Sequence, residues 1–137
     1  MSEPQPARPV PIPDADSRPF WEGVQAHELR IQRCRTCGRH IYYPRSLCPY
    51  CHGADLEWVR ASGSGVLYSY TVSRRPAGPG FAADVPYVVA LVDLDEGPRM
   101  MTNLVDVPVD EVTIGQRVQV VFREMSPGLT LPVFRPA

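Results

Sequence analysis

The sequence contains no lysine, and its 14 basic residues, all arginine, are set against 15 acidic residues, for a formal net charge of −1. A dedicated nucleic-acid-binding protein normally carries a strong basic excess, because it must neutralise the phosphate backbone. The missing excess therefore argues against that class of protein. We attribute the absence of lysine mainly to a genomic bias toward GC-rich codons, with selection of arginine for phosphate recognition as the alternative.

Long hydrophobic runs are missing as well. No apolar run approaches the roughly 20 residues that a membrane-spanning helix needs. The N-terminus also lacks a positively charged stretch followed by an apolar one, so it does not have the pattern of a secretory signal. We therefore predict a cytoplasmic protein without a membrane association, in which thiols stay reduced.

Proline, by contrast, is abundant, with six of its 16 residues within positions 1–19. This polar, proline-rich start cannot bury enough apolar surface to fold alone, so we predict that residues 1–16 form a disordered or extended arm. A sharper alternative is an arm that becomes ordered on a partner. The whole chain has 137 residues, 44% of them hydrophobic, which is enough for one real core.

A short helix is predicted directly after the arm, ending near Glu28. Asp16 or Ser17 can cap its N-terminus, and Pro19 suits its first turn. Its apolar face would be shared by Phe20, Val24 and His27. The following stretch, LRIQRC, is expected to be a strand that leads into the cysteines.

All four cysteines lie in one 18-residue stretch, CRTCGRHIYYPRSLCPYC, as the pairs Cys34/Cys37 and Cys48/Cys51. Two thiolates three residues apart on a tight turn can face one ion, and two such turns opposed across a hairpin complete a tetrahedron. Gly38 and Gly53 follow the two pairs and are expected to relieve strain in the turns. The spacing predicts one structural zinc ion, because four thiolates leave no open coordination position.

Other uses of these cysteines are less consistent with the pattern. A redox motif needs one Cys-x-x-Cys pair and not two at hairpin spacing, and disulfides are not expected in the cytosol. An iron site of the rubredoxin type has the same ligands, so the spacing alone leaves zinc and iron open. His40 and His52 are neighbours of the cysteines, but a complete cysteine set leaves them no position.

From Gly63 onward the pattern changes to the period of two that is typical of strands. In GVLYSYTVSRR, we expect Val66, Tyr68, Tyr70 and Val72 to share one face. Two later strands are expected to group Met100 with Thr102 and Leu104, and Val118 with Val120 and Phe122. Five strands in all, with one possible helical turn in VDEVTIG, predict a small antiparallel barrel or sandwich.

The order of these parts is more specific than any one of them. A helix with FWEG, a ribbon around LRIQRCRTCG and a barrel containing VPYVVALVDLDEGPRMMTNL resemble a family of zinc-ribbon plus OB-fold proteins associated with acyl-CoA metabolism. The resemblance covers about residues 17–135. It implies a mainly β fold, with an N-terminal helix and rubredoxin-like zinc ribbon over 17–60 and a five-stranded OB-fold barrel over 61–137.

The resemblance also implies a function. Members of this family look like non-catalytic partners of thiolase-fold enzymes, which make or break carbon–carbon bonds in acyl-CoA thioesters, in some cases in steroid side-chain degradation. Such a partner binds the enzyme and supports its stability or its CoA-thioester site. The residues agree with a protein that is not itself an enzyme, because the four cysteines are committed to metal and no nucleophile with a base is apparent.

Two groups of arginines are candidates for contact with the partner enzyme or with acyl-CoA. Arg74 and Arg75 open the long loop RRPAGPGFAADVP, which carries Phe81, and long loops in compact domains are often functional. The arginines would meet CoA phosphates while Phe81 lies against the acyl chain or the enzyme. The second group makes residues 29–53 locally basic, with no acidic residue there: Arg30, Arg33, Arg35, Arg39 and Arg45. For both groups the plain alternative is a solvated face.

Two other functions remain open at this point. OB barrels bind single-stranded nucleic acid by aromatic stacking, and tyrosines are available here, but residues 84–111 hold seven acidic residues and one arginine. A stand-alone structural module is the third possibility. The sequence does not name the acyl group, the partner enzyme or the stoichiometry.

Overall fold

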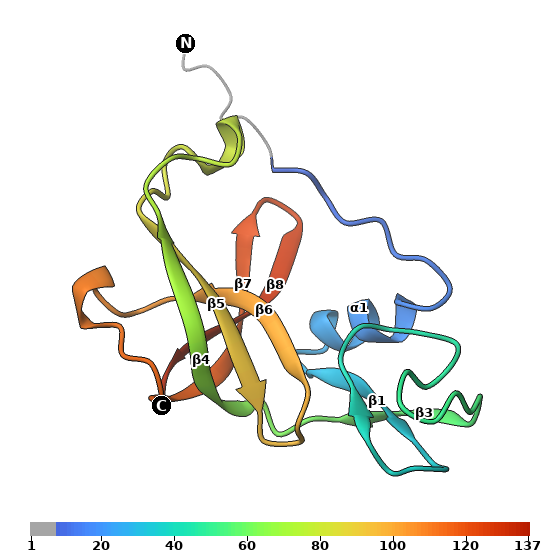
Figure 1. The fold of residues 1–137 in the computed structure, drawn as a ribbon. Helices are drawn as coiled ribbons and strands as arrows, with labels where there is room; N and C mark the ends of the chain where they lie inside the picture. Colours follow the sequence, from blue (N-terminus) through green and yellow to red (C-terminus); the bar gives the residue numbers. More distant parts are fainter. Residues whose placement is uncertain (1–7) are drawn as a thin grey trace.

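The computed structural model describes residues 8–137 and confirms the mainly β architecture. One helix, α1 (Arg18–Gln25), precedes a three-stranded ribbon and a five-stranded barrel, and the ribbon and barrel occupy different ends of the molecule in Figure 1. The ribbon strands are β1 (Arg30–Cys34), β2 (His40–Ile41) and β3 (Leu56–Arg60). The barrel strands are β4 (Ser64–Ser73), β5 (Tyr87–Leu94), β6 (Arg99–Leu104), β7 (Arg117–Ser126) and β8 (Leu129–Pro136), with the 3₁₀ turns η1 (Pro79–Phe81) and η2 (Val109–Glu111) between them.

The N-terminal arm was predicted over residues 1–16, of which 1–7 lie outside the described residues. Residues 8–14 follow an extended path without regular secondary structure. The helix starts after Ser17, but the Ser17 hydroxyl does not cap it. Instead Ser17 and Asp14 bond reciprocally, because the Asp14 carboxylate accepts from the Ser17 N–H at 2.8 Å and the Ser17 hydroxyl accepts from the Asp14 N–H at 3.1 Å.

The helix ends at Gln25, before the predicted end near Glu28. His27 takes a left-handed backbone conformation (φ 58°), its N–H bonds to the Val24 carbonyl, and the Glu28 N–H bonds to the Gly23 carbonyl at 2.8 Å. This is the bond pattern of a Schellman C-terminus. His27 therefore leaves the predicted helix face, and its ring stacks on Phe122 of the barrel at a centroid distance of 5.4 Å.

The barrel closes in the order β4-β5-β6-β8-β7. Its pairs are antiparallel except for a parallel contact of β6 with β8 between Leu104 and Phe134. Near its start, β4 lies so close to β5 that a side chain at Gly65 does not fit, because a Cβ there would lie 2.6 Å from the Asp93 carbonyl oxygen. The predicted groups on both strands face the core: Met100, Thr102 and Leu104 on β6, and Val118, Val120 and Phe122 on β7. The 3₁₀ turn η2 is the helical turn predicted in VDEVTIG.

The predicted face of β4 was only partly right. The register of β4 against β5 shifts between Leu67 and Ser69, so that Tyr68 is an extra residue in the strand. A bulge reverses the side-chain alternation, which places Leu67 in the core and leaves Tyr68 48% exposed. Tyr70 and Val72, after the bulge, contact the core as expected.

The helix and the base of the ribbon share one hydrophobic core with the barrel. Phe20, Val24, Leu29 and Ile31 belong to the same buried cluster as Leu67, Val118 and Phe134. A second, much smaller cluster holds only Cys34, Ile41 and Cys48, with Leu56 against it. Because one core crosses residues 60 and 61, the division of the chain into two domains there stays a prediction. In the described part of the chain, no helix is long and apolar enough to cross a membrane.

Candidate metal centre

The four cysteines come together at the tip of the ribbon. The Cys34 and Cys51 sulfurs are 3.5 Å apart, those of Cys37 and Cys48 are 3.7 Å apart, and all four lie within 4.8 Å of one another. Thiolates about 2.3 Å from a zinc ion in a tetrahedron lie roughly 3.8 Å from each other, so this donor set fits one ion. Within residues 8–137 the cluster contains cysteine alone, and neither His40 nor His52 belongs to it.

Each pair of cysteines sits on a turn closed by backbone hydrogen bonds. In the first turn the Gly38 N–H bonds to the Cys34 carbonyl at 2.8 Å, and Gly38 takes the left-handed conformation (φ 81°) that the sequence predicts for it. In the second turn the His52 N–H bonds to the Cys48 carbonyl at 2.9 Å, and His52 is the left-handed residue (φ 64°). The strain-relieving role predicted for Gly53 was therefore wrong. Gly53 instead leaves room for a thiol, since a Cβ there would lie 3.3 Å from the Cys51 sulfur.

Backbone N–H groups also point at the sulfurs and favour the thiolate form. The Cys37 N–H donates to the Cys34 sulfur at 3.5 Å, and this hydrogen bond is the largest of the contacts that together lower the pKa of the Cys34 thiol to about 6. The Tyr50 N–H donates to the Cys48 sulfur at 3.4 Å. Because the thiolate is the metal ligand, these donors prepare the site for zinc. Four thiolates close the coordination shell, so the ion holds structure and has no position for a substrate.

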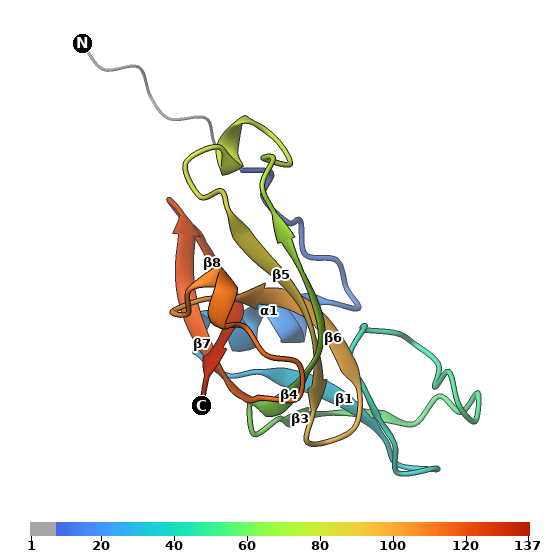
Figure 2. The same ribbon diagram turned by 60° about the vertical axis from the view of Figure 1, so that its left-hand side comes forward.

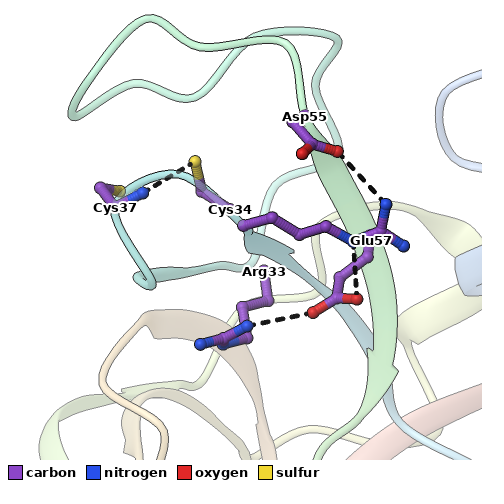
Figure 3. A network of polar contacts seen from close by, with 6 residues as sticks. Arg33, Cys34, Cys37, Asp55 and Glu57 are labelled. Atoms are coloured by element: carbon purple, nitrogen blue, oxygen red, sulfur yellow. Dashed lines mark hydrogen bonds and ion pairs between the residues drawn. The ribbon is translucent and has the colours of Figure 1, made fainter.

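The arginines around this site do not form the free basic surface that the local sequence suggested. Acidic residues from outside 29–53 fold back onto them (Figure 3): Glu57 on β3 accepts from Arg33 at 3.2 Å and from Arg35 at 3.0 Å. Both hydrogen bonds lower the pKa of the Glu57 carboxyl below its usual range, and the bond from Arg35 has the larger effect. Asp55 also pairs with Arg35, and Glu28 pairs with Arg30. Three of the five candidate arginines are thus neutralised by acidic residues, which favours a solvated face for them, while Arg39 and Arg45 are in no ion pair among residues 8–137.

The second candidate group belongs to the loop between β4 and β5, which lies at the far end of the barrel from β1 and β3 in both ribbon views (Figures 1 and 2). Arg74 and Arg75 are exposed, and neither guanidinium has an ion-pair partner among residues 8–137. The Ser73 hydroxyl donates to the Arg75 carbonyl at 2.9 Å and so orients the start of the loop. Phe81 is half-buried and not exposed, because its ring packs near Tyr87 at 6.1 Å between centroids.

One contact in this loop was missed by the sequence reasoning. Arg8, in the proline-rich arm, is buried and reaches the loop of Phe81. Together with Asp84, Tyr87, Leu104 and other apolar residues, it lines a hollow of about 260 Å³ at the end of the barrel. Nothing in the arm's composition signals this contact, because an arginine among prolines is typical of a solvated tail.

Comparison with known proteins identifies the parts of this fold. Residues 21–57 match the model described as the ChsH2 rubredoxin-like zinc ribbon domain, and residues 58–123 match the model of the ChsH2 C-terminal OB-fold domain. A "DUF35 domain-containing scaffold protein" of Methanothermobacter thermautotrophicus is 37% identical over 107 residues, which are 77% of this chain and 80% of the relative. The chain belongs to this DUF35 family. The zinc-ribbon assignment, with the four sulfurs in reach of one ion, identifies the metal as one zinc ion.

Other DUF35 relatives carry names of enzyme subunits. A "probable enoyl-CoA hydratase alpha subunit" of Thermomonospora curvata is 43% identical over 98% of this chain, which spans only 42% of that relative's length. "Benzoylsuccinyl-CoA thiolase subunit BbsA" of Thauera aromatica is 33% identical over 61% of this chain and 56% of the relative. A solved chain of the "Ltp2-ChsH2(DUF35) aldolase" is 43% identical, with a TM-score of 0.82 over 92% of this chain and 98% of that one.

Proposed function

We propose that this protein is a non-catalytic subunit of a thiolase-fold enzyme that acts on acyl-CoA thioesters. It binds the enzyme and supports its stability or its CoA-thioester site. The observation that carries the proposal is the match to the DUF35 chain of the Ltp2-ChsH2(DUF35) aldolase, because nearly the whole of that chain is covered at 43% identity. The names of a thiolase subunit and an enoyl-CoA hydratase subunit support the substrate class, and steroid or fatty-acyl side-chain degradation is the setting that the resemblance implies.

The chemistry of the chain is consistent with a supporting role. The cysteines, which would be the strongest nucleophiles, form a closed metal site. His27 stacks on Phe122, and within residues 8–137 it has no carboxylate bound to its ring that would make it a general base. The catalytic groups therefore belong to the enzyme partner.

The surface that we assign to the partner is the loop between β4 and β5. Arg74 and Arg75 are free to meet phosphates or carboxylates, which guanidinium groups bind with paired hydrogen bonds. Phe81 lies a few residues further, at the rim of the hollow at the end of the barrel. The loop thus places positive charge beside an apolar edge, which suits a CoA thioester held between two proteins.

Co-expression tests the proposal. A thiolase-fold enzyme from the same genome, co-expressed with this protein, should form a complex with it that survives size-exclusion chromatography, and the enzyme should lose activity or stability without it. Arg74→Glu with Arg75→Glu should weaken the complex, or raise the KM for the CoA thioester, by about tenfold, because a reversed charge now repels the anionic ligand or surface. Zinc content and folding should be unchanged.

Arg60→Glu with Arg135→Glu is the matched control, because it reverses two exposed arginines outside both candidate groups. An enzyme equally stable and active without this chain would show the subunit assignment to be wrong. A complex in which the loop variant behaves like the control would leave the function standing and refute only the placement of the surface.

A further inference from the structure

Arg8 is the one charged residue of residues 8–137 that is buried, at 8% exposure, although residues 9–16 of the same arm face solvent. Burying a guanidinium is unfavourable unless the charge is paired and its donors are used. Its surroundings meet these conditions. Arg8 forms an ion pair with the Asp84 carboxylate, donates to the Gly80 carbonyl at 3.3 Å, and lies 4.4 Å from the centre of the Phe81 ring.

These three contacts join segments that are more than 70 positions apart in the sequence. All three partners belong to the loop that precedes β5, so one side chain holds the arm to this loop at three points. Figures 1 and 2 both show the result: the described arm leaves the loop around η1 and runs to α1. The arm is therefore part of the folded surface.

The residues after Arg8 make the arm stiff. Prolines at positions 9, 11 and 13 fix their own φ angles and restrict the residues before them to extended conformations. They also remove every second N–H, so only the edge that carries the N–H groups of Val10 and Ile12 can pair with a strand. A partner can also contact its side chains. Those available are Val10 and Ile12, which are 61% and 91% exposed.

Beneath the arm lies an apolar hollow of about 310 Å³. Val10, Pro11 and Pro13 form one side of it, Trp21 of α1 another, and Leu129 at the start of β8 a third. The arm thus presents two exposed apolar side chains, and the hollow beside them has room for an apolar side chain of a partner. Arg74 and Arg75, in the loop that Arg8 contacts, have no ion-pair partner among residues 8–137, and the same holds for Arg18 and Glu22, which also line the hollow.

We propose that residues 8–13 are a docking segment for the partner enzyme. Arg8 locks the segment to the loop of Gly80–Asp84, and the locked segment presents Val10 and Ile12 to the enzyme. The occupant that fits is an apolar protein surface with acidic groups at its edge, because the chain offers apolar side chains beside two unpaired arginines. This inference rests on the proposed function for the identity of the partner, but the lock itself is a property of this chain alone.

The lock is tested without any partner, by amide hydrogen exchange on the full chain. Arg8→Met keeps the aliphatic stem and removes the charge, and Asp84→Asn removes the same ion pair from the other side. Both should speed exchange of the hydrogen-bonded amides of residues 81, 82 and 84 by about tenfold, because a local contact that opposes opening is lost. Arg45→Met, which removes an exposed arginine of the ribbon, should leave this exchange unchanged. Unchanged exchange in both test variants would overturn the lock.

Docking is tested with the enzyme and the double variant Val10→Ser with Ile12→Ser. Its loop should exchange like wild type, while its affinity for the enzyme should fall by about tenfold or more, since buried apolar anchors dominate such interfaces. Wild-type affinity in this variant would overturn the docking segment while the proposed function stands. If wild type itself does not bind the enzyme, the proposed function and the docking segment both fail, and the exchange result still decides the lock.

Discussion

His52 occupies a backbone conformation that ordinarily belongs to glycine. At φ 64° it closes the second cysteine turn, whereas Gly38 closes the first at φ 81°. A side chain in this region crowds its own backbone by roughly 1–2 kcal/mol, and branching at Cβ makes the crowding worse. The two halves of the zinc site are thus alike in geometry but unequal in strain.

This difference predicts how substitutions at His52 behave. His52→Gly should keep zinc and be at least as stable as wild type, while His52→Val should lose about 1–2 kcal/mol of metal-dependent stability. Competition with a chromophoric chelator measures the zinc affinity of each variant. His40→Val is the matched control, because His40 lies in strand β2, where a β-branched residue is favoured. Equal zinc affinity of His52→Val and the control would contradict the assignment of strain.

At the scale of the elements, the ribbon divides into a base and a tip. Leu29 and Ile31 of the base lie in the main core with α1 and the barrel. The tip has only Cys34, Ile41 and Cys48 in its own buried cluster, with Leu56 against it. So small a cluster cannot offset the entropy of ordering the two turns, which leaves the metal to hold them.

Removal of the metal should therefore disorder the tip and spare the rest. After treatment with a strong chelator under reducing conditions, residues 34–53 should lose amide protection, while β1, α1 and the barrel strands keep theirs. Elemental analysis of untagged protein should first give about one zinc per chain, because four thiolates saturate one tetrahedral ion. Global unfolding on chelation would show that the tip and the main core are one cooperative unit. A metal content near zero in reduced protein would refute the site.

At the scale of the whole molecule, arginine–carboxylate pairs link strands that are distant in sequence. Arg117 of β7 donates through both terminal nitrogens to Asp95 in the turn after β5, at 2.9 and 2.8 Å. Arg123 of β7 likewise uses both terminal nitrogens to bind the two carboxylate oxygens of Asp106. These hydrogen bonds lower the pKa of both carboxyl groups below the usual range for aspartate. Acidic residues are thus matched to arginines from other elements across the barrel.

The lowered pKa of Asp95 determines how its contribution depends on pH. A carboxyl whose pKa is lower when folded stabilises the protein above its unfolded pKa, near 3.9, and loses that contribution as the pH falls through the folded value. Asp95→Asn should therefore destabilise the protein near pH 6, and its difference from wild type should shrink as the pH falls below about 4. Urea unfolding at a series of pH values measures this difference. A difference that stays constant down to pH 3 would show that the ion pair does not stabilise the fold.

The sequence by itself determined the features that depend on local pattern. Cys-x-x-Cys spacing specifies the metal ligands because the reach of a tight turn is a short-range property. Alternation in the regions of Met100–Leu104 and Val118–Phe122 specified which side chains face the core, because regular strands keep a period of two. The left-handed conformation of Gly38 is also a local feature, because glycine adopts it at little cost.

Only the tertiary structure decided the features that depend on residues distant in sequence. The bulge at Tyr68 follows from the register of β4 against β5, so local alternation could not place Leu67 inside. Glu57 neutralises Arg33 and Arg35 because β3 pairs with β1, which no charge count over residues 29–53 can include. Arg8 is buried because the arm meets a loop more than 70 positions away. Such contacts form only when folding brings segments that are distant in sequence together, so no single segment specifies them.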